Sequence, residues 1–358
     1  MTDVAELSEH FRALGSDHRN RSPLHAHLCS AAADDPEIVA LLQAAPQDQQ
    51  LPVLLMAAVH SIVLAEPDLE LAAYYPSVTE APRAGDAFPA FRALCHRRAD
   101  ELRRIVAHRQ VQTNEVGRSA IFLPALAQIA DAVGPIGLLD VGASAGLNLQ
   151  LDRFEYHYSP GGDVGGPSPV VVRTATRGEV PVPAVVPAIS ARLGIDRSPI
   201  DAADADDARW LMACVWPDQR DRFERMRDAL ALAREHPVAV CRSDAVDGLR
   251  AAVDEVASAG HPVVLNSWVL NYLGDDRRRA YLAELDAIGR ERDLDWLYAE
   301  APALCAGIPF GDRGDDPFIT ALTLTTWRAG ERSTRHLAAA HPHGYWLHWH
   351  HGAPIEPS

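Results

Sequence analysis

The sequence predicts an α/β fold in which an α-helical N-terminal region precedes a largely parallel sheet. Residues 1–133 carry helix formers and clustered apolar residues almost throughout. From residue 136 short apolar runs alternate with helical stretches, which is typical of βαβ units. Near the end, 317–330 and 344–351 alternate with period two and have no clear helix between them. We expect these two segments to form a closing antiparallel pair.

The N-terminal helices follow from propensity and from proline positions. Pro23, Pro36 and Pro52 lie near helix starts, where the missing N–H costs least. A proline- and glycine-rich break at 74–91 divides the region, and we place the domain boundary so that 1–118 is a helical cap and 119–358 a second domain. The expected helices are 4–14, 22–33, 36–45, 51–65, 91–109 and 115–133.

The second domain is expected to alternate strands and helices. Between its first two strands, residues 154–187 alternate aromatic residues and turn on glycines, which predicts an inserted β-hairpin or small flap. The expected strands are 136–141, 188–195, 237–241, 262–267 and 294–299, and the expected helices are 204–215, 218–235, 245–259 and 275–291.

Composition excludes several functions. The chain has 358 residues and a net charge of −16, which disfavours nucleic acid as a partner. All 33 basic residues are arginine, so a Walker A lysine and Schiff-base chemistry are both absent. The five cysteines are scattered, without a C-x-x-C pair. We find no membrane-spanning run and no signal-peptide pattern, and expect a cytoplasmic protein with no membrane partner.

The string Gly142-Ala143-Ser144-Ala145-Gly146 fits two kinds of site. Read as G-x-S-x-G it is the nucleophile elbow of a serine hydrolase, with Glu300 and His343 available downstream. That elbow normally follows several strands, one of which supplies an oxyanion donor, whereas everything before residue 136 is predicted to be helical. Read as D-x-G-x-S-x-G, it is a small-residue turn after the first strand, where a cofactor approaches the backbone. We favour the second reading. A nicotinamide fingerprint is disfavoured because its third glycine would fall at Leu147.

Four segments together resemble class I S-adenosylmethionine-dependent methyltransferases. They are "LLDVGASAG" (138–146), "LGIDRSP" (193–199), "CRSDAVDGL" (241–249) and "VVLNSWVLNYL" (263–273). The resemblance implies a Rossmann-like seven-stranded sheet whose last strand is antiparallel. The chain also resembles a bacterial family of uncharacterised methyltransferase-like proteins, in the segments 111–119, 140–149, 207–219 and 266–273.

The resemblance implies S-adenosylmethionine as cofactor and a small molecule as substrate. Asp140 would bind the methionine ammonium, Asp196 the ribose hydroxyls, and Asp244 with Ala245 the adenine. The polar stretch 112–118 lies beside the predicted pocket, although its residues can also simply cap the next helix. The predicted cofactor-binding residues are Gln112, Asn114, Glu115, Arg118, Asp140, Gly142, Ala143, Ser144, Gly146, Asn148, Asp196, Asp244, Ala245 and Asn266.

The residues that would bind the methyl acceptor are less clearly indicated by the sequence. Ser267, Trp268 and Tyr272 are expected to line the substrate pocket, with His60 or Glu300 as catalytic base. Asn266 stands where many amino-methylating enzymes have an Asn-Pro-Pro-aromatic turn, but the prolines are missing, so the sequence leaves the type of atom that is methylated open.

The loop 301–317 has the composition of a lid. No metal is expected from the histidine-rich end, which lacks an accompanying carboxylate or cysteine. A cofactor-binding relative with a non-methylating or regulatory role is the alternative, and the sequence leaves the oligomeric state open.

Overall fold

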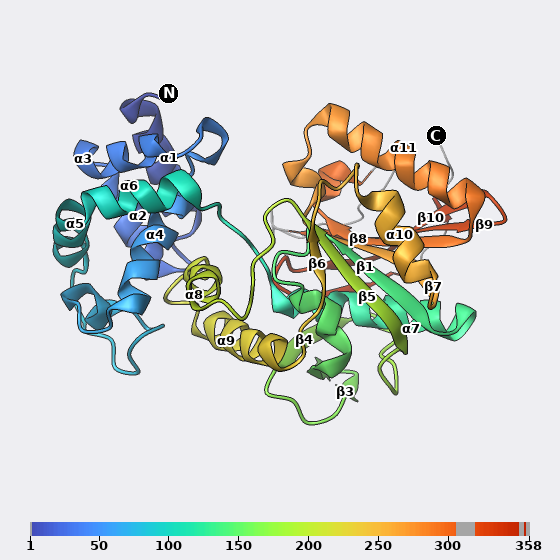
Figure 1. The fold of residues 1–358 in the computed structure, drawn as a ribbon. Helices are drawn as coiled ribbons and strands as arrows, with labels where there is room; N and C mark the ends of the chain where they lie inside the picture. The colour runs from blue at the N-terminus through green and yellow to red at the C-terminus, as the bar shows by residue number, and fades with distance from the viewer. Residues whose placement is uncertain (1, 306–318, 351–353, 356–358) are drawn as a thin grey trace. The chain divides into compact units, whose positions relative to one another are not determined.

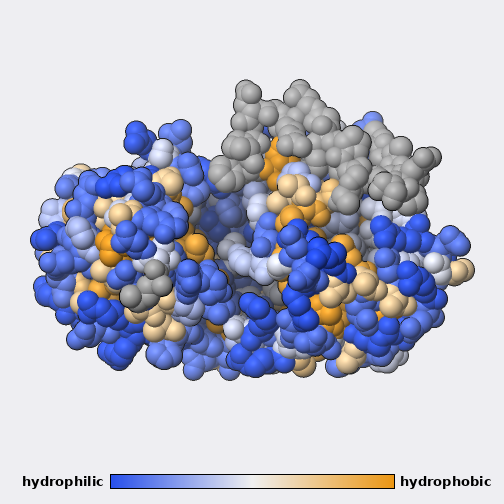
Figure 2. All heavy atoms as spheres, turned by 90° about the horizontal axis from the view of Figure 1, so that it is seen from above, coloured by the Kyte–Doolittle hydropathy of each residue, from blue (hydrophilic) through white to orange (hydrophobic). Residues whose placement is uncertain are grey.

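The chain divides into two compact units in this computed structural model, which describes residues 2–305, 319–350 and 354–355. The N-terminal unit comprises Met1–Thr113 with Asp201–Arg227. The sheet unit comprises Asn114–Ile200 with Asp228–Ser358. Residues 201–227, which the sequence places after the second strand, therefore pack with the N-terminal helices. Figure 2 shows hydrophilic residues over most of the visible surface, in keeping with the net charge of −16.

The N-terminal unit is helical, as the sequence predicts. Prolines occupy the first turns of α2, α3 and α4, and Asp35 caps α3 by accepting hydrogen bonds from the Glu37 and Ile38 N–H groups. α4 is buried along most of its length and packs against α8. The helices of this unit are α1 (Val4–Asp17), α2 (Pro23–Ala32), α3 (Pro36–Ala40), α4 (Pro52–Ala65), α5 (Phe88–Arg97), α6 (Ala99–His108) and α8 (Ala205–Ala213).

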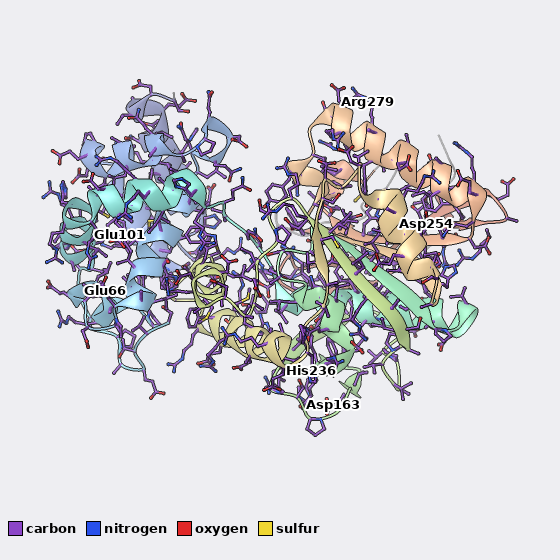
Figure 3. The ribbon with its side chains drawn as sticks, viewed as in Figure 1. Glu66, Glu101, Asp163, His236, Asp254 and Arg279 are labelled. Carbon is purple, nitrogen blue, oxygen red and sulfur yellow. The ribbon has the colours of Figure 1, made fainter. Side chains whose placement is uncertain are left out.

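The helix expected over 91–109 is two helices that meet at Arg98. Arg98 has φ −111° and ψ 24°, outside the helical range. Its guanidinium donates to Glu66, the residue that follows α4, at 2.6 Å and to Glu101 of α6 at 2.9 Å (Figure 3). Hydrophobic periodicity alone does not reveal this break, because the apolar positions continue across it.

His60 lies in the core of the N-terminal unit, where it is 1% exposed. Its Nδ1 lies 3.1 Å from the Ala213 carbonyl, which can only accept, so Nδ1 carries the proton. Nε2 then accepts from the Ser77 hydroxyl at 2.8 Å. Burial lowers the pKa of His60 to about 4. These contacts favour a structural role for His60 over the general base predicted from the sequence.

We expect acid to destabilise the N-terminal unit through His60. The unfolded histidine protonates below about pH 6.5, whereas burial keeps the folded one neutral to about pH 4. The unfolded state therefore binds more protons in this window, and the free energy of unfolding falls as pH falls, by up to about 3 kcal/mol at 1.4 kcal/mol per pKa unit. Urea denaturation followed by tryptophan fluorescence at pH 7, 5.5 and 4 measures the loss.

In the variant His60→Gln this part of the pH dependence should disappear, whatever the variant does to stability at pH 7. His157→Gln is the control, since His157 lies on a hairpin between Glu155 and Asp163. An unchanged difference between pH 7 and pH 4 in His60→Gln would contradict the assignment.

The sheet unit is built around one sheet with parallel and antiparallel pairs. Among the described residues the strands follow the order β3-β2-β4-β11-β10-β9-β8-β7-β1-β5-β6, with β12 pairing β10. The strands are β1 (Ile136–Val141), β2 (Glu155–Ser159), β3 (Gly162–Val164), β4 (Val171–Arg177), β5 (Ile189–Asp196), β6 (Val240–Arg242), β7 (His261–Ser267), β8 (Leu294–Glu300), β9 (Thr320–Arg328), β10 (Glu331–Ala340), β11 (Trp346–Trp349) and β12 (Pro354–Ile355).

The α/β class is confirmed, but the described sheet is larger than the seven strands expected. The five parallel strands β6-β5-β1-β7-β8 are those that the sequence predicts. The predicted closing pair is wrong in its partners, because β10 lies between β9 and β11 and pairs antiparallel with both. The sequence hides β10, since its first half carries charged and polar residues and is largely exposed.

The predicted insertion is also only partly correct. β2 and β3 form the expected antiparallel hairpin, but β2 also pairs in parallel with β4. β4 then pairs in parallel with β11, in register from Ala175 opposite Trp346 to Arg177 opposite His348. Rather than a separate flap, residues 155–177 are three further strands of the main sheet.

Helices cover both faces of the central strands (Figure 1). α10 (Leu249–Ala257) and α11 (Asp275–Glu291) bury Leu249, Val253 and Leu285 in one core with residues of β1, β5, β7 and β8. On the other face lies α7 (Ser119–Val133), which contacts β4 and β8. Residues 116–133 are long and apolar enough to cross a membrane, but 72% of this segment is buried, as expected for a core helix. α9 (Arg220–Glu235) contributes residues to both units.

Candidate functional site

The carboxyl ends of the central parallel strands gather most of the predicted site residues. From β1 the chain runs outward to β5 and β6, then returns to β7 on the other side of β1 and continues to β8. The topological switch therefore lies between β1 and β7, which are in register from Ile136 opposite His261 to Val141 opposite Asn266. In open α/β sheets, ligands bind in the crevice that such a switch opens at the carboxyl edge.

The glycine-rich loop after β1 has left-handed backbone at Gly142, Ser144 and Gly146, with φ values of 77°, 53° and 68°. A Cβ on Gly142 would lie 2.6 Å from a Val269 methyl carbon, so both the backbone and the space require glycine there. The Gly142 and Ala143 N–H groups both donate to the Ile195 carbonyl at the end of β5. The loop is thereby held against the end of β5, as the cofactor-loop reading of the sequence requires.

Two predicted site residues fix this loop. One Asp196 oxygen accepts from the Ser144 N–H at 2.8 Å and the other from the Ser198 N–H at 2.7 Å. The Asn114 amide donates to the Ala143 carbonyl at 3.2 Å, so the polar stretch 112–118 does reach the loop. Each oxygen of the Asp196 carboxylate keeps a lone pair for another donor.

Asp140 is the buried acid of this edge. It lies one residue before the end of β1, is 2% exposed, and accepts no side-chain hydrogen bond from any described residue. Its pKa is raised to about 8, mainly by burial and also by the negative charge of Asp196, while Arg118 opposes both. An acid that is buried without a donor is rare in proteins, so Asp140 is a candidate contact for a ligand that would supply one.

Asn266 lies on β7, and side chains of α11 and β8 fix the orientation of its amide. Its side-chain oxygen accepts from the Tyr281 hydroxyl at 2.7 Å and from the Trp296 indole N–H. The residue is fully buried, and among the described residues its Nδ2 has no hydrogen-bond partner.

Glu300 lies at the end of β8 beneath the turn that follows β7. Its Oε1 accepts from the Val269 N–H at 2.7 Å, whereas the buried Oε2 has no partner among the described residues. Burial raises the pKa of Glu300 to about 7, against the lowering effect of the Val269 and Leu270 N–H groups. Trp268, at the start of this turn, has φ 60°, which strains a bulky side chain, and its indole donates to Thr320 at 2.8 Å.

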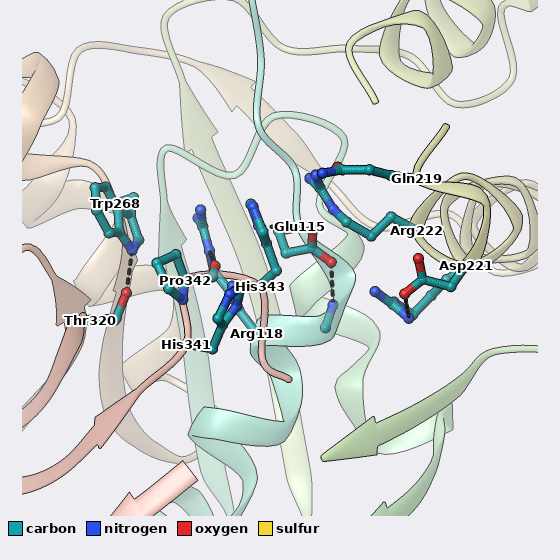
Figure 4. Close-up of polar contacts among 12 residues, drawn as sticks. Glu115, Arg118, Gln219, Asp221, Arg222, Trp268, Thr320, His341, Pro342 and His343 are labelled. Carbon is teal, nitrogen blue, oxygen red and sulfur yellow. Dashed lines mark hydrogen bonds and ion pairs between the residues drawn. The ribbon is translucent and has the colours of Figure 1, made fainter. Parts of the chain in front are cut away.

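Arg118 ties this turn to the segment before β11 (Figure 4). Its guanidinium donates to the Pro342 carbonyl at 2.7 Å and to the hydroxyl and carbonyl of Ser267 at 3.0 and 3.1 Å, and it lies 5.8 Å from the centre of the Trp268 ring. Arg118 is 3% exposed. It is a buried support for the turn that follows β7, and its charge lowers the pKa values of Asp140 and Glu300.

The remaining residues of the 112–118 stretch are divided between the units. Glu115 caps the short turn before α7 by accepting from the Gly117 N–H at 2.9 Å, and its second oxygen lies 3.3 Å from Nδ1 of His343. The sequence suggests Thr113 and Asn114 as the caps with Glu115 in the first turn, whereas the residue that caps is Glu115. Gln112 belongs to the N-terminal unit, as does His60.

Other predicted residues occupy the same edge of the sheet unit. Asp244 follows β6 and accepts from the Val246 N–H at 2.8 Å and from Arg277, and Ala245 beside it is 8% exposed. Asn148 is buried, and no described residue bonds its side-chain oxygen. Tyr272 is 67% exposed.

Sequence reasoning missed Gln150, which is 1% exposed and whose amide has no partner among the described residues. An amide between the leucines of "LNLQL" was the available signal. The predicted lid falls mostly at 306–318, outside the described residues. Within the part of the chain that the structure describes, no group of three or more metal-ligating side chains comes together.

Comparison with known proteins gives one match. The family profile described as "Uncharacterized protein conserved in bacteria (DUF2332)" matches residues 8–349. The chain belongs to this family. Searches among curated proteins and among solved structures returned no match. The match spans both units.

Proposed function

We propose that the protein is an S-adenosylmethionine-dependent methyltransferase that acts on a small molecule. The observation that carries the proposal is Asp140, a buried carboxyl at the topological switch of the sheet that accepts no hydrogen bond from the residues that the structure describes. An ammonium group beside it would supply the missing hydrogen bonds and the compensating charge.

The residues around Asp140 fit the rest of this cofactor. Asp196 already orders the loop and retains a lone pair on each oxygen for a pair of ribose hydroxyls. Asp244 and Ala245 come next along the edge, after β6, where the adenine would lie. The left-handed backbone of the glycine-rich loop permits close approach of a ligand to the chain.

When bound, the cofactor supplies a methyl group that its sulfonium has already activated toward a nucleophile. The chain then has mainly to bind, orient and exclude water. Asp140 would hold the amino-acid end, Asp196 the ribose, and the turn at Ser267 and Trp268, supported by Arg118, would face the acceptor.

Calorimetry with S-adenosylhomocysteine tests the proposal. We expect one ligand to bind per chain, with micromolar affinity. The variant Ser144→Gly should bind equally well, because glycine adopts the left-handed backbone at this position without strain. No heat of binding at millimolar ligand would refute the methyltransferase assignment.

The serine hydrolase is tested in the same samples with a fluorophosphonate probe. We expect no labelling of Ser144, since the described bonds of its backbone, from the Ile200 N–H and to Asp196, serve to order the loop. Labelling that disappears in Ser144→Gly would favour the hydrolase instead. Binding of the ligand without transfer to any acceptor would favour the non-methylating relative.

A further inference from the structure

The hydrogen-bond partners of the Asn266 amide identify which of its two terminal atoms is the oxygen and which is the nitrogen. The Trp296 indole N–H is a donor only, so the Asn266 atom that it contacts must be the oxygen. The Tyr281 hydroxyl occupies that same oxygen at 2.7 Å. With both lone pairs engaged, Asn266 offers only its N–H groups to a ligand, and these have no partner among the described residues.

Glu300, on the neighbouring strand, offers a hydrogen-bond acceptor where Asn266 offers a donor. Asn266 is in register with Tyr298, so Glu300 lies two residues further along β8. From strand geometry their Cα atoms are about 8 Å apart, close enough for the two side chains to converge on one atom. Oε1 of Glu300 is held by the Val269 N–H, which leaves the buried Oε2 as an acceptor without a donor among the described residues. Two unsatisfied buried groups, a donor and an acceptor, therefore end adjacent strands.

We propose that the methyl acceptor is a hydroxyl group, whose oxygen accepts a hydrogen bond from the Asn266 amide and whose proton faces Oε2 of Glu300. This inference rests on the proposed function and narrows it to oxygen methylation. The Asn266 oxygen is already bound twice, so this residue offers only N–H groups. An amine that attacks through its single lone pair cannot also accept one of them, whereas a hydroxyl oxygen has a second lone pair for it. A target carboxylate would lie against the Glu300 carboxylate and be repelled.

The proposed step balances with these groups alone. A lone pair of the hydroxyl oxygen forms the bond to the methyl carbon, the carbon–sulfur bond of the sulfonium breaks with its electron pair on sulfur, and the hydroxyl proton passes to Glu300. The products are a methyl ether, a thioether and a protonated Glu300. A carboxyl with a pKa of about 7 is suited to take up and return this proton near neutral pH.

The test uses the full chain with S-adenosylmethionine carrying a ¹³C-labelled methyl group. Three pools of small compounds are offered, namely alcohols and phenols, amines, and carboxylic acids, and ¹³C NMR then identifies the product methyl as ether, amine or ester. We expect methyl ethers from the first pool and a background signal from the other two. Labelled amines or esters would overturn the inference, and so would the absence of any product.

Two near-isosteric variants test whether the Asn266 amide and the Glu300 carboxylate each contribute to ether formation. Asn266→Asp replaces the free donor by an acceptor, and we expect at least a tenfold loss of ether formation. Glu300→Gln keeps an oxygen for the Val269 N–H but removes the base, and should abolish the rise of the rate with pH near 7. The inference moves Asn266 from the cofactor, where the sequence prediction placed it, to the methyl acceptor. S-adenosylhomocysteine should therefore bind both variants within twofold of wild type, so failure of the proposed function, seen as lost binding by wild type, is distinct from failure of this inference.

Glu284→Gln is the matched control, a partly exposed carboxylate on α11 that pairs with Arg250. It should leave rate and pH profile unchanged. Tyr281→Phe is the second probe of orientation, because it removes one of the two bonds that fix the amide and keeps the ring. If Asn266 were only a core residue, Asn266→Asp would lower thermal stability, ligand binding and transfer together, and that result would overturn the inference.

Discussion

Binding of S-adenosylhomocysteine at pH 7 should release close to one proton per chain, and this release should vanish in Asp140→Asn. Burial holds the pKa of the free Asp140 at about 8, so the acid is mostly protonated at pH 7. The ligand ammonium favours the ionised carboxylate, so its arrival lowers this pKa and expels the proton. Affinity should accordingly rise with pH, by nearly tenfold per unit below pH 8, until the pKa of the complex is reached. Calorimetry in two buffers of different ionisation enthalpy measures the release.

Two controls isolate this effect. Methylthioadenosine, which lacks the amino-acid end, should bind with an affinity independent of pH between 6 and 8. Glu300→Gln removes the other buried acid with a raised pKa and should still release the proton. If proton release in Asp140→Asn equalled that of wild type, the ammonium would have to be placed elsewhere.

Gly344→Ala should be the most damaging single-methyl substitution that we propose. Gly344 has φ 74°, which costs alanine about 1–2 kcal/mol. The added Cβ would also lie 2.0 Å from the Gly117 carbonyl oxygen, and displacing that backbone costs about 1–3 kcal/mol more. We expect the free energy of unfolding to fall by about 2–5 kcal/mol, and Tm by about 4–20 °C.

Gly330→Ala is the matched control because it has the same kind of backbone without the clash. Gly330 has φ 83° in the β9–β10 turn, and an added Cβ would lie 3.7 Å from its nearest neighbour, the Arg290 carbonyl oxygen. Its loss should be about 1–2 kcal/mol, from backbone strain alone. Urea denaturation of both variants gives the comparison, and equal losses would show that the Gly117 backbone yields freely.

The sequence predicts the parts of this fold that depend on local pattern. β1 was placed residue for residue, because "IGLLDV" is apolar, short and bounded by turn residues. The acids at the carboxyl ends were identifiable for the same reason, since Asp140 and Glu300 each interrupt an apolar run near its end. Their roles as ligands remain predictions.

The pairing of strands that are distant in the sequence cannot be predicted from local patterns of residues. β10 begins with exposed polar residues and is a strand because β9 and β11 flank it, which no window of sequence contains. Likewise, the sequence suggests that Asn266 accepts hydrogen bonds from a ligand. Tyr281 of α11 and Trp296 of β8 occupy its oxygen, so that only its N–H groups are left for a ligand. The burial that raises the pKa of Asp140 is equally a property of the assembled sheet.

The parallel pairing of β4 with β11 has a consequence for how the chain is made. Ala175 and its partner Trp346 are separated by roughly 170 residues, which a ribosome adds in roughly ten to thirty seconds. For that time the nascent sheet exposes the edge of β4, a strand with alternating buried residues and an open row of backbone N–H and C=O groups. We expect this edge to be where chaperones engage the nascent protein and where premature termination leads to aggregation.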